Sequence, residues 1–125
     1  MSNPPDLAKK DLSHVNLATA NLAGADLHEA SLRNATLTET NLEGADLTSA
    51  DLSHANLAGA SLRNASASHA NMADADLRDT DLEGTNLRGA SLAGAKLSDA
   101  QRTVATAAGA DFAEAHGEGE SASGD

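Results

Sequence analysis

The feature that most constrains this chain is a leucine spacing of five residues. All seventeen leucines fall on one series that runs from Leu7 to Leu97 in steps of five. Alanine usually stands two residues before each series position, and aspartate, asparagine or serine stands one residue before it. The chain therefore consists of repeats of the form Ala-(Asp/Asn/Ser)-Leu-x-x, whose positions are numbered −2 to +2 around the central residue.

A five-residue period fits neither an α-helix nor a β-strand. A helix advances about 100° per residue and a strand alternates faces at every residue, so either element would scatter the leucines. We therefore expect a chain that bends once per repeat, with the central residue and its alanine pointing inward. Stacked turns of this kind bury a continuous narrow column.

The predicted core contains the nineteen central positions, of which two are not leucine. Ala67 and Met72 are consecutive centres, and a flexible methionine is able to fill space beside a small alanine. Compensated packing is the favoured interpretation, and a local dent that shapes a binding surface is the alternative. The predicted core residues are Leu7, Leu12, Leu17, Leu22, Leu27, Leu32, Leu37, Leu42, Leu47, Leu52, Leu57, Leu62, Ala67, Met72, Leu77, Leu82, Leu87, Leu92 and Leu97.

Glycine placement gives separate evidence for the bend. Every glycine before residue 110 falls two residues after a centre, as Gly24 and Gly59 do. Glycine adopts a positive φ at low steric cost, as a tight turn requires. Asn34 and Asn64 occupy the same position, and asparagine tolerates this conformation better than most residues. The +2 position is therefore predicted to be the turn.

The runs 25–27, 45–47, 50–52 and 55–57 read Ala-Asp-Leu or Ala-Asn-Leu, and they closely resemble the repeats of pentapeptide-repeat proteins. The resemblance covers residues 6 to about 100. It implies an all-β fold, a right-handed quadrilateral parallel β-helix with four repeats per coil and about five coils. The best-known activity in this family is that of quinolone-resistance proteins, which bind DNA gyrase by imitating duplex DNA.

The ends of the chain differ from its middle. Pro4 and Pro5 lack the amide that would continue a hydrogen-bond ladder, which predicts an N-terminal cap at 1–5 before the solenoid at 6–100. Residues 116–125 are rich in glycine, serine and glutamate, and they are predicted to form a disordered acidic tail.

Residues 101–115 have two interpretations. Arg102 stands where a buried leucine is expected, which indicates either a degenerate last coil or a C-terminal cap. In the second case a short helix in 103–115 turns Val104 and Phe112 onto the end of the rod. The degenerate coil is favoured because Phe112 keeps the five-residue register. Val104 and Phe112 are the candidates for an end cap or a dimer contact.

Charge gives the main indication of partners. The formal net charge of −11 argues against direct nucleic-acid binding. Residues 1–100 hold fourteen acidic and seven basic residues, a net −7. Duplex DNA of the predicted rod length, about 24 Å, carries about 14 charges, so the rod has half the charge density of DNA. The densest acidic patch is the candidate partner-binding surface, formed by Asp74, Asp76, Asp79, Asp81 and Glu83.

Motifs for catalysis and metal binding are weak. The Ser-His pair at 53–54 would lie as consecutive outward residues on a convex surface, without the recess that a hydrolytic triad needs. Segment 79–84 resembles the start of a calcium loop, but Ala90 stands where the closing glutamate is required. We predict no enzyme activity, no catalytic residue, no cofactor and no metal site.

Location and function follow from these observations. Cysteine is absent, no stretch approaches the roughly 20 apolar residues of a membrane span, and residues 1–10 lack an apolar signal region. We expect a cytoplasmic, non-catalytic solenoid that serves as a protein-interaction or scaffold module, as a monomer or an end-to-end homodimer. The alternative, which rests on the resemblance, is a DNA-mimicking modulator or protector of a type II topoisomerase such as DNA gyrase.

Overall fold

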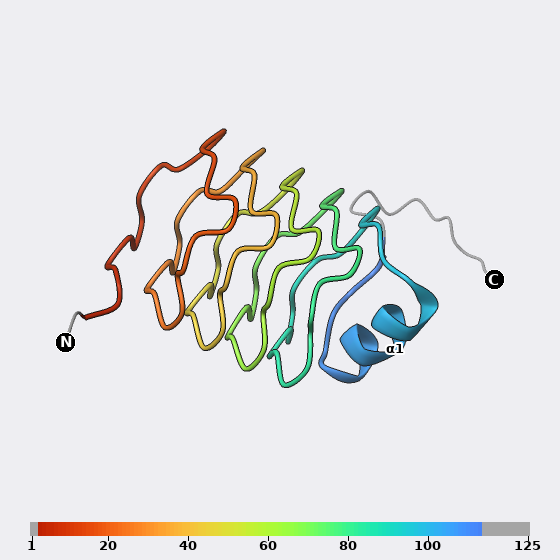
Figure 1. The fold of residues 1–125 in the computed structure, drawn as a ribbon. Helices are drawn as coiled ribbons and strands as arrows, with labels where there is room; N and C mark the ends of the chain where they lie inside the picture. Colours follow the sequence, from red (N-terminus) through yellow and green to blue (C-terminus); the bar gives the residue numbers. More distant parts are fainter. Residues whose placement is uncertain (1–2, 114–125) are drawn as a thin grey trace.

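The fold is a stack of coils with one helix at its C-terminal end (Figure 1). The computed structural model describes residues 3–113, so the predicted tail at 116–125 lies outside the described residues. Parallel β-bridges pair residues twenty apart, as Asp26 with Asp46 and Asp46 with Ser66. Four repeats therefore make one coil, and each side of the coil carries one repeat.

Each typical repeat pairs four of its five backbone amides with backbone carbonyls. The −2 amide closes a turn onto the previous centre, the −1 amide donates to the preceding coil, and the centre and +2 amides donate to the following coil. In repeat 50–54 the acceptors are Leu47 O for Ala50, Ala30 O for Asp51, Asn71 O for Leu52 and Ala73 O for His54, at 2.6 to 3.0 Å. The coils are thus held together by hydrogen bonds on every side.

The fifth amide, at +1, is paired by the −1 side chain where that residue is aspartate or asparagine. The amide of Ser53 donates to Asp51 Oδ1 at 3.0 Å, and the amide of Ala73 donates to Asn71 Oδ1 at 3.0 Å. An aspartate or asparagine oxygen that accepts from the amide two residues later forms an Asx turn. The preference for these residues at −1 follows, because their short side chains provide the acceptor that the +1 amide needs.

The +2 position is the turn, as the glycine placement predicted. Every +2 residue from Lys9 to Gly94 has a φ between 56° and 74°, and twelve of these residues are not glycine. The next −2 amide donates to the central carbonyl, as in Ala55 to Leu52 at 3.1 Å. A positive φ at the third of four residues is what a type II turn requires.

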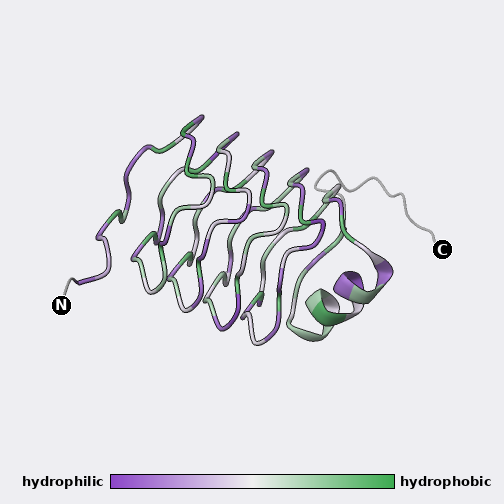
Figure 2. Ribbon diagram, in the orientation of Figure 1, coloured by the Kyte–Doolittle hydropathy of each residue, from purple (hydrophilic) through white to green (hydrophobic). Residues whose placement is uncertain are grey.

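The core is the column of central residues. The centres from Leu22 to Leu92 are buried, whereas Leu7, Leu12, Leu17 and Leu97, near the two ends, are partly buried. Ala67 and Met72 are both fully buried, which favours compensated packing over a dent. In Figure 2 the hydrophobic colour recurs along each coil between hydrophilic stretches, as this inward and outward alternation requires.

Threonine replaces the inward alanine at three −2 positions without leaving a hydroxyl unpaired. Thr80 and Thr85 are each 4% exposed, and their hydroxyls donate to Leu57 O at 2.7 Å and Leu62 O at 2.6 Å. Thr40 is buried in the same way and donates to Leu17 O. A buried hydroxyl is costly only when it lacks a partner, so these positions tolerate threonine.

The expected all-β fold is only partly present. The pairs are isolated bridges, and residues 3–113 contain no run of consecutive strand residues. The reason is the turn after each centre, which redirects the chain before pairing can extend along a side. Within the described residues, the regular element is the helix α1 (Asp99–Ala107).

The helix α1 begins earlier than the sequence analysis placed it. Ser98 is the N-cap, its hydroxyl accepts from the amide of Gln101, and the Gln101 side chain accepts from the amide of Ser98. This is a capping box, whose Ser-x-x-Gln signature is visible in the sequence. The alternative interpretation therefore predicted a helix correctly, but it placed the helix at 103–115 instead of 99–107.

The favoured interpretation of a degenerate coil does not hold for the helical residues, but the register that suggested it returns after them. Asp111 forms a parallel bridge with Ser91, twenty residues earlier. Phe112 is partly buried against the core, and the guanidinium carbon of Arg102 lies 4.2 Å from the centroid of its ring. The helix thus replaces part of one coil, but this coil still has twenty residues, so the register is kept.

Val104, predicted to turn onto the rod end, lies beside the last coil but is not buried in the core. Its side chain is 44% exposed, whereas the neighbouring Ala105 is fully buried in the core. The helix therefore packs into the core through a small residue, and Val104 lies partly exposed beside Leu82 at the rod end. Of the two predicted end residues, Phe112 is the one packed against the core.

The side chain of Gln101 takes the place of a backbone amide from the next coil. In the preceding coil the amide of Asp81 donates to Ala60 O at 3.0 Å.

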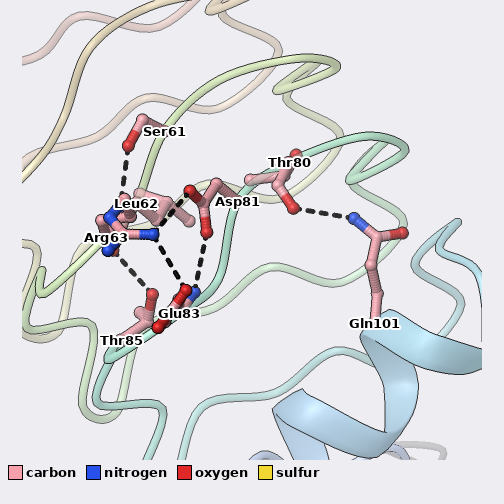
Figure 3. A network of polar contacts seen from close by, with 8 residues as sticks. All are labelled: Ser61, Leu62, Arg63, Thr80, Asp81, Glu83, Thr85 and Gln101. Atoms are coloured by element: carbon pink, nitrogen blue, oxygen red, sulfur yellow. Dashed lines mark hydrogen bonds and ion pairs between the residues drawn. The ribbon is translucent and has the colours of Figure 1, made fainter.

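 By the twenty-residue register, Thr80 O should accept from the amide of residue 101. The side-chain nitrogen of Gln101 donates instead, to Thr80 O at 2.9 Å (Figure 3). It also donates to Leu77 O at 2.6 Å. One side chain thus satisfies two carbonyls at the end of the stack.

The substitution Gln101→Glu tests this end cap. It keeps an oxygen that accepts from Ser98 but removes the donor, so we expect a loss of about 1–3 kcal/mol in the free energy of unfolding at neutral pH. The measurement is urea unfolding followed by circular dichroism. Because the carboxylate is disfavoured beside two carbonyls, its folded-state pKa is raised, and the loss should shrink once the pH falls below that pKa. An unchanged free energy of unfolding at neutral pH would contradict the cap.

Candidate functional site

The five carboxylates of the predicted acidic patch do not share one face. Each side of the coil carries one repeat, so Asp74 lies on one side, Asp76 and Asp79 on the next, and Asp81 and Glu83 on a third. The acidic patch therefore wraps around the rod. Acids that are close in the sequence are separated because the chain bends after every centre.

Arginine neutralises part of the acidic patch. Arg78 binds Asp76 through two hydrogen bonds, from Nε to Oδ1 at 2.9 Å and from the terminal nitrogen to Oδ2 at 2.7 Å. The hydrogen bonds from Arg78 hold the pKa of Asp76 below its ordinary value of 3.8. Asp76 therefore remains ionised but is already paired.

Arg63 pairs with the other end of the patch (Figure 3). Its terminal nitrogen lies 3.3 Å from Asp81 Oδ2 and 2.9 Å from Glu83 Oε1, both in the following coil. These two carboxylates raise the pKa of Arg63, with the hydrogen bond to Asp81 as the largest cause. The register also permits an ion pair between Arg63 and Glu43, one coil earlier. Arg63 instead pairs with the two carboxylates of the next coil.

The Ser-His pair at 53–54 is not arranged as a nucleophile and base. Ser53 is 3% exposed, and its hydroxyl donates to Asp51 Oδ1 at 2.6 Å while it accepts from Arg33 at 2.9 Å. His54 Nε2 faces Asp74 at 3.7 Å. The hydroxyl is committed to its neighbours, and the imidazole is directed toward the next coil.

The sequence analysis missed a cluster of Asp26, His28 and Asp46. Their ligand atoms lie within 4.8 Å of one another, the side chains are half-buried, and His28 Nδ1 is 2.7 Å from Asp26 Oδ1. Imidazole and carboxylate are ligands that divalent metals such as zinc accept. The signal was available, because Asp26 and Asp46 are twenty residues apart and thus stack.

The electrostatics of this cluster are those of a hydrogen-bonded ion pair. The hydrogen bond with Asp26 raises the pKa of His28 above 6.5, and the charges of Glu29 and Asp46 act in the same direction. The same hydrogen bond lowers the pKa of Asp26 below 3.8. The His28 contribution to stability is full below the ordinary histidine pKa and is lost as the pH rises through the folded value. The Asp26 contribution is lost as the pH falls through its lowered pKa.

The pKa of His28, measured by NMR titration of its ring protons, tests this geometry. We expect a value above 6.5 in the native protein. Asp26→Asn should lower the value more than Asp46→Asn, because Asp26 supplies the hydrogen bond and Asp46 acts only through its charge. Equal effects of the two substitutions, or an unshifted histidine, would contradict the arrangement.

Two cavities lie where α1 meets the last coils. The larger, of about 530 Å³, is lined by Arg78, Lys96 and Asp79 among others, and the smaller, of about 260 Å³, lies beside Leu82 and Val104.

Among residues 3–113, no helix has the length and apolar character needed to cross a membrane.

Comparison with protein families gives one match. Residues 11–48, 45–84 and 70–101 match the family described as pentapeptide repeats, with eight copies. A comparison with curated proteins finds no match.

Several solved structures resemble the chain. A pentapeptide repeat protein from the Arabidopsis thaliana thylakoid lumen is 33% identical, with a TM-score of 0.60 over 79% of this chain and 72% of that one. HetL, involved in heterocyst differentiation regulation in the cyanobacterium Nostoc, is 32% identical, with a TM-score of 0.62 over 72% of this chain and 48% of that one. Rfr23 from the cyanobacterium Cyanothece is 41% identical, with a TM-score of 0.55 over 70% of this chain and 64% of that one. The chain therefore belongs to the pentapeptide repeat family, whose members form right-handed quadrilateral β-helices.

Proposed function

We propose that this protein is a non-catalytic interaction or scaffold module. The observation that carries the proposal is the register of twenty residues, which stacks the outward side chains of successive coils in fixed columns. Coils stacked like strands are spaced about 4.8 Å apart, so about five coils present a rigid surface roughly 24 Å long. Such a surface suits recognition of another protein, because its side chains are positioned before binding.

The acidic character of the surface favours a partner with basic residues. Asp74 and Asp79 are exposed members of the patch, and the chain carries a net charge of −11. Electrostatic complementarity of this kind mainly raises the association rate and excludes acidic partners. A cytoplasmic location is part of this proposal.

A second candidate is a DNA-mimicking modulator of a type II topoisomerase such as DNA gyrase. Its support is the negative charge, which extends over three sides of the rod in the acidic patch. Arg63 and Arg78 weigh against it, because each pairs with carboxylates that a DNA mimic would leave free. The charge density of residues 1–100, about half that of duplex DNA, weighs in the same direction.

Photocrosslinking from two positions in one column of stacked +2 residues tests the proposal. A photoreactive residue replaces Asp79 in one variant and Thr19 in the other, because both are exposed +2 residues on the same side of different coils. We expect one protein to crosslink from position 79, and the yield to fall when Asp74 and Asp81 are changed to asparagine. The asparagine side chain keeps an acceptor for the Asx turn at position 81, so the change removes charge without removing the turn.

The identity and pattern of the crosslinked product decide between the candidates. A single partner of another class supports the interaction module, and a topoisomerase subunit supports the second candidate. No product from either position, or equal yields of the same mixture from both, would contradict a specific interaction on this surface.

A further inference from the structure

The side of the rod that carries Leu62 and Leu82 ends in an open backbone edge. In the coil that precedes this edge, the amides of Leu62 and Asn64 donate to Asp81 O at 2.9 Å and Glu83 O at 3.0 Å. One coil later the equivalent amides belong to Leu82 and Gly84. Neither donates to an acceptor within residues 3–113, because the chain enters α1 instead of continuing as the next repeat.

A cavity lies between this edge and the helix. Its volume is about 260 Å³, with Leu82 and Glu83 on the side of the coil and Ala100 and Val104 on the side of α1. Figure 3 shows Gln101 reaching from α1 to Thr80, at the start of the edge. The edge therefore has a closed end at Thr80 and open donors beyond it.

We propose that this edge binds an extended, lysine- or arginine-bearing segment of a partner protein. The segment adds one parallel strand, and two of its carbonyls, two residues apart, accept from the amides of Leu82 and Gly84. This arrangement repeats what Asp81 and Glu83 do for the coil below. Strand addition to an open edge is a common mode of peptide recognition, in which backbone hydrogen bonds give affinity and side-chain contacts give specificity.

The side chains around the edge determine the chemistry of the segment. Asp81 and Glu83 line the cavity, and no cationic side chain does. Arg63 pairs with both carboxylates from the coil below, which leaves one net negative charge. Val104, 44% exposed, offers an apolar contact. Alternate side chains of a strand point to opposite faces, so a segment that alternates basic and apolar residues fits the edge.

The same charges disfavour other occupants. Residues 114–125 contain four carboxylates and neither lysine nor arginine, so the C-terminal residues of this chain would be repelled. A second copy of the chain carries a net charge of −11 and would be repelled as well. The inference rests on the proposed role as an interaction module and specifies the chemistry of one of its partners.

NMR with the full chain and two probe peptides tests the inference. The first is an acetylated and amidated Lys-Val-Lys-Val-Lys peptide, and the second is its charge-reversed counterpart Glu-Val-Glu-Val-Glu. The lysine peptide should shift the amide signals of Leu82 and Gly84 and slow their hydrogen exchange about tenfold or more at saturation. The glutamate peptide should have no such effect.

Two matched variants separate this edge from other surfaces. Ala100→Phe fills the cavity from the helix, whereas Ala107→Phe places the same side chain at an exposed position of α1 that does not line it. We expect the first to abolish the effect of the peptide and the second to preserve it. The inference is overturned if the peptide shifts other surfaces instead, or if neither amide responds.

The free protein provides one further outcome. Slow exchange of both Leu82 and Gly84 without peptide would show that the edge is already occupied, by residues 114–125 or by a second copy, and would also overturn the inference. A partner that still crosslinks from position 79 in the Ala100→Phe variant would leave the interaction module intact. Failure of this edge is thus distinguishable from failure of the proposed function.

Discussion

Hydrogen bonding between coils is the constraint on which the rest of the structure depends. Buried backbone amides need acceptors, and the backbone of a five-residue repeat cannot supply them from within the repeat. The centre and +2 amides find acceptors in the following coil, and the −1 amide finds one in the preceding coil. The +1 amide depends on the side chain at −1. The Ala-(Asp/Asn)-Leu pattern is therefore one solution to both backbone pairing and core packing.

The same constraint makes the ends of the rod special. A terminal coil lacks a neighbour on one side, so some donors and acceptors remain to be paired by other groups. At the C-terminal end Gln101 satisfies the carbonyls of Leu77 and Thr80, but it has no acceptor for the amides of Leu82 and Gly84. The structural role of α1 and the proposed peptide-binding edge are thus two results of one interruption.

The sequence predicts the repeated part of the fold well because each repeat carries the same local information. The leucine series identifies the core, and the glycines identify the turn. The C-terminal end is harder, because the capping box of Ser98 and Gln101 competes with a five-residue register that returns at Asp111. A sequence that satisfies both patterns does not indicate which residues leave the coil.

The candidate surfaces were predicted less well because proximity in the sequence is not proximity on a four-sided rod. Asp74 and Glu83 belong to one acidic run but lie on different sides, whereas Asp26 and Asp46 are distant in the sequence and stack. Residues that stack in adjacent coils are twenty positions apart in the sequence. Side-chain choices such as that of Arg63, which turns to the following coil, depend on the local balance of charges.

Residue-resolved amide hydrogen exchange tests the central claim most directly. The account predicts that centre and +2 amides are protected throughout the inner coils, and that +1 amides are protected only where the −1 side chain accepts a hydrogen bond from them. Ala58, whose amide donates to Asn56 Oδ1 at 3.0 Å, should therefore exchange more slowly than Arg33, which follows Ser31 and has no acceptor within the described residues. Equal protection of Ala58 and Arg33, or protection that alternates every second residue as in an ordinary strand, would contradict it.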